Sequence, residues 1–140
     1  MSGTQAIMDP LSITAAVVAL IGAANAAWKI AVRFRKSYYK ARDQMKSLED
    51  TLLRFGISLG VLKRNDIASW LRENGFPEGK VKFTLERSQE VVEKIRRTID
   101  LCQKDHASWG MAGAAKVREY CNELFQYERE IVPLAQSVSV

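Results

Sequence analysis

The sequence predicts an all-α fold: a four-helix bundle with an apolar N-terminal helix and a short helical connector between its second and third helices. Apolar residues recur every three or four positions in four long segments, which is the period of a helix that buries one face. No segment alternates apolar and polar residues as a half-buried strand does. The chain has 140 residues, which fits one domain with a substantial core. We expect residues 1–7 to be a flexible leader or residues added for expression, residues 8–135 to be the domain and residues 136–140 to be a tail.

The first helix is expected from about residue 12 to a point between residues 31 and 35. Asp9 or Ser12 can cap its start, and Pro10 suits a first helical turn. Alanine then recurs at every fourth position: Ala15, Ala19, Ala23, Ala27 and Ala31. Such a row of small side chains lets a neighbouring backbone come close, in a protein core or in lipid.

The second helix is expected over residues 37–62, with an apolar seam at spacings of three and four: Met45, Leu48, Leu52, Phe55 and Leu59. No proline or glycine separates it from the first helix, so either a break lies within residues 33–38 or the two form one kinked helix. The connector, residues 63–80, contains a short helical turn followed by a turn at Asn74-Gly75. The short helical turn carries Ile67, Trp70 and Leu71.

The third and fourth helices are expected over residues 79–105 and 108–131. The inward face of the third consists of Val81, Leu85, Val92, Ile95, Ile99 and Cys102, with Ser88 in the same row. The inward face of the fourth consists of Met111, Ala114, Val117, Cys121, Leu124 and Ile131. Pro133 is expected to end the fourth helix, because proline lacks the N–H that a helix interior needs.

The net charge of +5 is concentrated in one short stretch. Residues 43–140 carry as many acidic as basic residues, and the first 28 residues carry a single charge, Asp9. Residues 29–42 carry no acid and six cations, which we call the basic collar: Lys29, Arg33, Arg35, Lys36, Lys40 and Arg42. A basic stretch on a neutral body indicates a local anionic partner, unless it is an ordinary solvated face.

Two anionic partners fit the collar, nucleic-acid phosphates and the headgroups of an anionic membrane. Tyr38 and Tyr39 interleave with the cations, as aromatic residues do in nucleic-acid binders. The rest of the chain, however, offers no extended track of cations for a phosphate backbone. Anionic lipid is therefore the favoured partner, and nucleic acid is the less favoured one.

An uncharged segment, Pro10–Trp28, precedes the collar. It is borderline in length for a membrane-spanning helix, which needs about 20 apolar residues, and it is rich in alanine. Cations that follow it are wrong for a secretory signal but right for a helix whose basic end stays at a cytoplasmic surface. The segment fits a conditional inserter, buried in a bundle or placed in lipid. Its expected membrane-contacting residues are Leu11, Ile13, Val17, Leu20, Ile21 and Trp28.

Candidate catalytic and metal-binding residues are few. The single histidine, His106, removes multi-histidine metal sites and most acid–base schemes, and with Cys102 it gives at most two ligands on one helix. The loop from Gly75 to Lys80 departs from a phosphate-binding loop in spacing. The carboxylates of the last helix, Glu128 among them, alternate with cations as on a solvated face. We expect a non-enzymatic protein without cofactor or metal, with two reduced thiols typical of an intracellular compartment.

The segment Met8-Asp9-Pro10-Leu11-Ser12-Ile13-Thr14-Ala15 and the apolar helix after it resemble the opening of a fungal family. These are the N-terminal domains of fungal STAND/NLR-type receptors, including the HeLo-like domains. The resemblance is specific from Met8 to Leu20 and only general beyond it. The chain departs from the family in lacking the polar, proline-containing break that usually follows the first helix.

The resemblance implies a four-helix-bundle signalling domain that normally precedes a nucleotide-binding oligomerisation module. In HeLo-type members it implies programmed cell death, as in heterokaryon incompatibility and innate immunity. Oligomerisation releases the N-terminal helix, which then damages the plasma membrane. The expected partners are thus anionic membrane lipids, further copies of the chain and a nucleotide-binding receptor module in the same or a separate chain.

The expected localisation is cytoplasmic, and conditionally at the plasma membrane. The alternative is a recruitment module without membrane activity. In that case the first helix stays in the core, and an exposed helical face binds a partner domain.

Overall fold

The computed structural model describes residues 10–140, with side chains from residue 13 onward. These residues form five α-helices and contain no strand, so the all-α prediction is confirmed for this part of the chain. In chain order the elements are α2 (Pro10–Ser37), the 3-10 helix η1 (Tyr39–Ala41), α3 (Arg42–Arg64), α4 (Ile67–Glu73), α5 (Glu78–Lys104), the π-helix η2 (Trp109–Gly113) and α6 (Ala114–Val138). The predicted leader, residues 1–7, lies outside the described residues.

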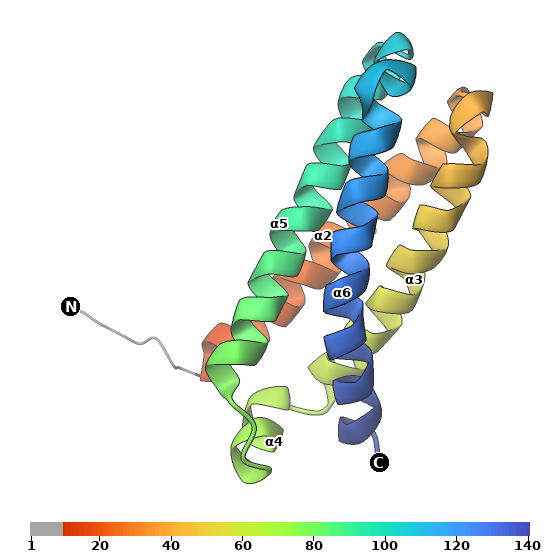
Figure 1. Cartoon of the computed structure of the whole chain (residues 1–140). Coiled ribbons are helices and arrows are strands. Elements are labelled where there is room, and N and C mark those ends of the chain that lie inside the picture. Colours follow the sequence, from red (N-terminus) through yellow and green to blue (C-terminus); the bar gives the residue numbers. More distant parts are fainter. Residues whose placement is uncertain (1–9) are drawn as a thin grey trace.

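Helices α3, α5 and α6 run roughly alongside one another, and α2 crosses behind them from the lower end of α5 to the upper end of α3 (Figure 1). It packs against both α3 and α5, and α6 packs against the same two helices from the other side. The short helix α4, which the sequence predicts as a helical turn, lies at one end of the molecule and contacts α2, α3 and α5 (Figure 1). Any displacement of α2 therefore opens two long interfaces at once.

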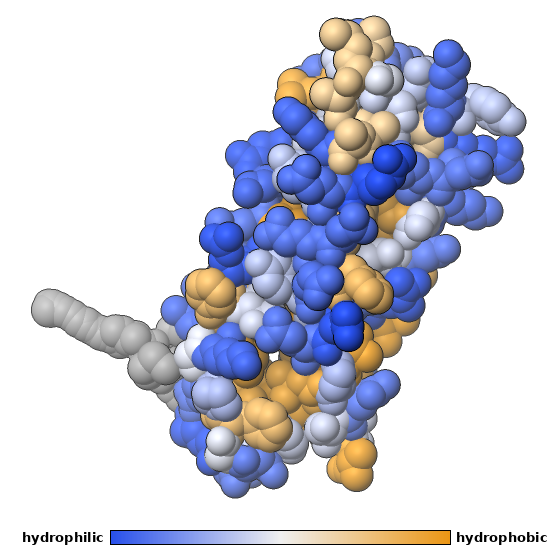
Figure 2. Space-filling view, viewed as in Figure 1, coloured by the Kyte–Doolittle hydropathy of each residue, from blue (hydrophilic) through white to orange (hydrophobic). Residues whose placement is uncertain are grey.

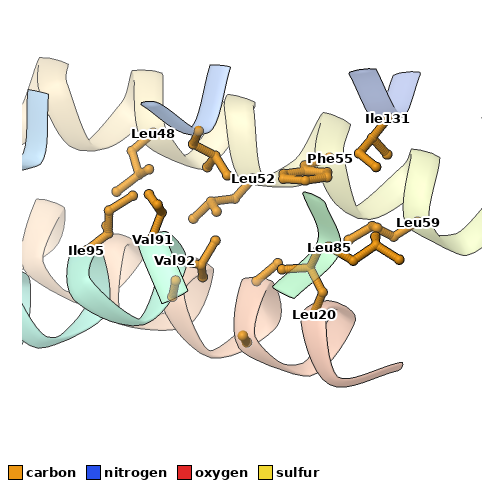
Figure 3. Close-up of a cluster of buried hydrophobic side chains, with 14 of the residues drawn as sticks. Leu20, Leu48, Leu52, Phe55, Leu59, Leu85, Val91, Val92, Ile95 and Ile131 are labelled. Carbon is orange, nitrogen blue, oxygen red and sulfur yellow. The ribbon is translucent and has the colours of Figure 1, made fainter. Parts of the chain in front are cut away.

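The core forms where the predicted seams meet. All five seam residues of α3 are buried, and so are most of the predicted inward residues of α5, Ser88 included. Figure 3 shows side chains from four helices converging: Leu20 from α2, Leu48, Leu52, Phe55 and Leu59 from α3, Leu85, Val91, Val92 and Ile95 from α5, and Ile131 from α6. Burying one such side chain contributes roughly 1.5–3 kcal/mol, so this cluster is the main source of stability.

The chain reverses direction between α2 and α3 at a single extended residue. Tyr38 has φ −140° and ψ 102°, which ends α2 at Ser37 and excludes one continuous kinked helix. The Ser37 hydroxyl donates a hydrogen bond of 3.2 Å to the carbonyl of Phe34, in the last turn of α2. The break therefore lies at the C-terminal edge of the predicted window, and η1 separates it from α3.

The prediction that Pro133 ends the last helix is wrong. α6 contains Pro133 and continues to Val138, which takes it into the segment expected to be a tail. Leu134, Ala135 and Val138 beyond the proline are buried in the core. Their burial keeps this part of the chain helical despite the hydrogen bond that proline cannot donate.

The prediction that Met111 faces inward is also wrong, because its side chain is 84% exposed. Residues 109–113 form a π-helix, whose wider turn changes the helical register ahead of α6. Trp109 and Gly113 are buried in its place. A Cβ atom at Gly113 would overlap Sγ of Cys102, so the close contact between η2 and α5 requires glycine at this position.

Candidate functional site

The predicted membrane-contacting residues lie mainly on the packed side of α2. Ile13, Val17 and Leu20 are buried in the core, whereas Ile21 and Trp28 are partly buried at its edge. The side chain of Leu11 lies outside the described residues. Of the alanine row, Ala23, Ala27 and Ala31 are buried, and Ala15 and Ala19 are exposed. The structure thus presents α2 as an integral core helix.

The outward face of α2 is exposed and carries no charge between Ile13 and Trp28. Its exposed residues beyond Thr14 are Ala15, Val18, Ala19, Gly22, Asn25 and Ala26. Among the described helices, α2 provides the one stretch, Ile13–Ser37, whose length and apolar composition are sufficient for a membrane span. Core helices of soluble proteins satisfy the same criterion. The uncharged outward face is the feature that needs a functional explanation.

Five of the six collar cations are exposed, in the C-terminal part of α2, in η1 and at the start of α3: Lys29, Arg33, Lys36, Lys40 and Arg42. The sixth, Arg35, is half-buried and paired with Glu49 of α3 through two hydrogen bonds. Its Nε donates to Oε2 at 2.6 Å, and its Nη2 donates to Oε1 at 3.2 Å. This side-chain hydrogen bonding raises the pKa of Arg35, so the guanidinium is permanently charged.

An aromatic cluster lies beside this ion pair. The buried ring of Phe34 contacts Tyr38, His106 and Trp109 at centroid distances of 5.7, 5.9 and 5.3 Å. The rings of Tyr38 and His106 are 4.4 Å apart. Together with the Arg35–Glu49 pair, this cluster attaches the C-terminal end of α2 to α3 and to the segment between α5 and α6. We call these six residues the α2 anchor.

The sequence gives no sign of the α2 anchor, because its members come from three distant segments. Glu49 lies 14 residues after Arg35. His106 and Trp109 lie in the turn after α5 and in η2. Arg35 is the one anchor residue that the sequence analysis assigned to the collar, and in the structure it is paired with Glu49.

Two of the surface grooves along α3 share Ile57. A groove of about 300 Å³ lies between α2 and α3, and Ile21, Trp28 and Leu53 are among its lining residues. A larger one of about 610 Å³, the α3–α6 groove, lies between α3 and α6. Ile57 lines both and is 65% exposed. Leu53 and Ile57 lie off the predicted seam, and that offset is the signal in the sequence that could have indicated an apolar outer surface.

Figure 2, viewed from the same side as Figure 1, shows a mostly hydrophilic face with scattered apolar patches. Glu128 lines the α3–α6 groove. The prediction that it lies on a solvated face is wrong, because Glu128 is only 5% exposed. The helical row of Val117, Cys121, Leu124 and Ile131 includes position 128, and this spacing could have revealed its burial.

The cysteines and the histidine do not form a common site. Cys102 is packed against Gly113, and the ring of His106 lies against Tyr38. Burial raises the pKa of the Cys121 thiol to about 11, and it also raises the pKa of Cys102. Within residues 10–140, no group of three or more His, Cys, Asp or Glu side chains is arranged to hold a metal ion.

Comparison of the chain with protein-family models, curated proteins and solved structures finds no match. The function is therefore inferred from the geometry described above.

Proposed function

We propose that the chain is a non-enzymatic signalling domain of the HeLo-like, cell-death-inducing type, which targets anionic membranes by releasing α2 from a four-helix bundle. In this proposal α2, α3, α5 and α6 are the bundle, and α2 is the element that enters lipid. The observation that carries the proposal is the exposed, uncharged outward face of α2.

A helix on the surface of a soluble protein normally turns a charged face to water. Helix α5 does so, since Glu86, Glu90, Lys94 and Arg97 are exposed along it. In α2, by contrast, neither the buried nor the exposed face carries a charge from Ile13 to Trp28. A helix that is uncharged all round meets no charge penalty in hydrocarbon, where a single Arg, Lys or Asp at the centre costs about 2.5–3.5 kcal/mol on insertion scales.

The basic collar supports the same proposal. Near an anionic membrane each exposed cation contributes about 1 kcal/mol of attraction. The collar follows directly after the apolar part of α2, so it would hold the basic end of the helix at the headgroups while the apolar part enters lipid. Several copies of the chain at one place would multiply this attraction.

The α2 anchor defines where release would stop. Phe34 and Arg35 are tied to α3 and to the turn before α6, so the segment before Phe34 is the part free to leave. Leaving removes Ile13, Val17 and Leu20 from the core, at roughly 1.5–3 kcal/mol for each side chain. Lipid offers the same side chains an apolar environment, so the two states can be close in free energy and a trigger can select between them.

The experiment that tests the proposal is dye leakage from vesicles, with a charge placed on the outward face. Val18 is 46% exposed, so Val18→Glu leaves the core intact and changes stability by about 0.5 kcal/mol or less. We expect wild-type protein to release dye from phosphatidylcholine vesicles that contain phosphatidylserine, and Val18→Glu to release at least about tenfold less.

The matched control is Leu101→Glu, which places the same charge at an apolar position of α5 that is 64% exposed. This variant should leak like the wild type. Equal leakage by Val18→Glu and wild type would reject insertion of α2. Equal loss in both variants would mean that net charge, and not the outward face, controls the activity.

The second candidate function is a recruitment module in which α2 never leaves. The exposed apolar side chains of Leu53 and Ile57 favour it, because large exposed apolar residues next to a groove are typical of protein-binding surfaces. This function predicts no leakage under any lipid composition. It also predicts that Ile57→Glu abolishes partner binding while Val18→Glu does not.

A further inference from the structure

The α3–α6 groove contains a buried carboxylate that lacks a hydrogen-bond donor. Glu128 is 5% exposed, and its Oε1 has no hydrogen-bond partner among the described residues. Arg54 Nε lies 3.6 Å from Glu128 Oε2, which is too long for a hydrogen bond. A buried acceptor without a donor destabilises a fold. The groove is therefore lined by a buried carboxylate with unfilled hydrogen-bonding capacity.

The residue that follows Glu128 has a backbone carbonyl that also lacks its usual donor. Pro133 is inside α6 and has no N–H, so the carbonyl of Arg129 lacks the donor that an ordinary residue at position 133 would supply. Both residues line the groove. The wall of the groove thus contains one carboxylate with unfilled hydrogen-bonding capacity, followed in the chain by a backbone carbonyl that lacks its usual donor.

The rest of the groove combines two cations with apolar walls. Arg54 and Arg129 are both exposed, and among the described residues no acidic side chain lies within ion-pair distance of Arg129. The apolar part is lined by Ile57, Phe125, Val132 and Pro133. Phe125 is 50% exposed, so an aromatic surface is open to a partner.

We propose that the α3–α6 groove binds the headgroup of phosphatidylserine. The groove has one carboxylate and two guanidinium groups, and this headgroup has one ammonium and two anionic groups. The ammonium donates to the carboxylate of Glu128. The phosphate and the carboxylate pair with Arg54 and Arg129, and the glycerol end of the acyl chains lies on Ile57 and Phe125.

Other common headgroups fit less well. Phosphatidylcholine has a quaternary ammonium without N–H, so it cannot donate to Glu128. Phosphatidylglycerol has no cation, so its phosphate would pair with the arginines, but its hydroxyl groups would give Glu128 only hydrogen bonds from neutral donors. The inference rests on the proposed membrane function, which it deepens by naming the lipid class. Its site lies on α3 and α6, away from the outward face of α2.

The experiment uses the full chain and monomeric, short-chain lipids, followed by amide NMR spectra. Dihexanoyl phosphatidylserine should shift resonances around residues 54–58 and 125–133. Dihexanoyl phosphatidylcholine and dihexanoyl phosphatidylglycerol should bind at least about tenfold more weakly, since each lacks both an ammonium with N–H donors and the carboxylate of the serine headgroup. Glycerophosphoserine, which lacks acyl chains, should also bind more weakly, and this distinguishes a lipid from a free headgroup.

Glu128→Gln and Arg129→Gln should each reduce the affinity for dihexanoyl phosphatidylserine about tenfold. Arg129 is exposed, so its variant tests the site even if replacement of Glu128 disturbs the fold. Arg97→Gln on α5 is the matched control and should bind like the wild type. Equal affinity for all three lipids, or shifts confined to the collar, would overturn the proposal.

Monomeric lipid offers no bilayer, so this assay does not depend on insertion of α2. Leakage that is lost in Val18→Glu, combined with no selectivity for the serine headgroup, would refute the groove alone. Selective binding without leakage would refute the proposed insertion alone.

Discussion

At Gly113 the backbone of η2 passes so close to Cys102 that no side chain fits between them. We expect Gly113→Ala to lower the free energy of unfolding by about 1–3 kcal/mol, the range for inserting atoms into a packed core. Gly110→Ala is the control, because a Cβ there meets no atom within 4 Å. Urea unfolding followed by circular dichroism measures both, and equal stability of the two variants would contradict this packing.

The Cys121 thiol has a pKa of about 11, because burial disfavours its charged form. At neutral pH its thiolate is then roughly a hundredfold rarer than that of an unperturbed thiol, so iodoacetamide should modify it slowly. The rate should rise about tenfold per pH unit up to pH 10. Since the folded protein holds the protonated thiol, the unfolded chain ionises first, and stability should fall as pH rises above the ordinary thiol pKa.

Peptide mass spectrometry after timed alkylation separates Cys121 from Cys102. Protein unfolded in urea provides the reference rate. Native Cys121 that reacts as fast as the unfolded reference at neutral pH would show that the thiol is not protected.

At the scale of elements, the α2 anchor is the contact most relevant to release. Glu49→Gln removes the charged partner of Arg35. We expect this variant to unfold at a lower temperature and to leak dye at a lower protein concentration, because the C-terminal end of α2 is held less firmly, so release can extend past Phe34, and one more collar cation is free.

Asp50→Asn is the matched control, since it removes an exposed carboxylate from the neighbouring position of the same helix. It makes the same change in net charge without touching Arg35. If both variants raise leakage equally, attraction to the membrane and not the anchor explains the effect.

The positions of the helices could be predicted from apolar spacing, since the seam of α3 and most of the inward row of α5 are buried as expected. The end of α6 could not be predicted in this way. Pro133 favours an end to the helix, but the burial of Leu134 and Val138 keeps the chain helical beyond it. The prediction that Met111 faces inward was wrong for a related reason. Residues 109–113 form a π-helix in which Gly113 packs against Cys102, and apolar spacing does not reveal this change of register.

For the candidate site, the sequence located the apolar helix and the collar but not their surroundings. The pairing of Arg35 with Glu49, and the groove that holds Glu128, depend on which helices become neighbours in space. Spacing within one helix cannot supply that information. Spacing could have marked Glu128 as a core position, whereas its charge led to the wrong prediction of a solvated face. Such conflicts between spacing and charge often mark functional positions.

At the scale of the whole molecule, α2 is both a structural member and the proposed moving part. Its departure would leave α3 and α5 with only one of the two helices, α6, that pack on both of them (Figure 1). We expect a chain without residues 1–28 to keep much of its helical circular dichroism but to bind a hydrophobic dye, as loosely packed helical states do. Complete loss of helical circular dichroism in this truncated chain would show that α3 to α6 do not fold without α2.

The most direct test of the central claim follows the environment of α2 itself. An environment-sensitive fluorophore on Val18→Cys reports on the outward face, and the native thiols, with raised pKa values, should label far more slowly. On addition of vesicles that contain phosphatidylserine, we predict a blue shift of its emission and quenching by quenchers placed deep in the acyl chains. Emission that stays at the wavelength seen in water, while the protein is bound to those vesicles, would contradict insertion of α2.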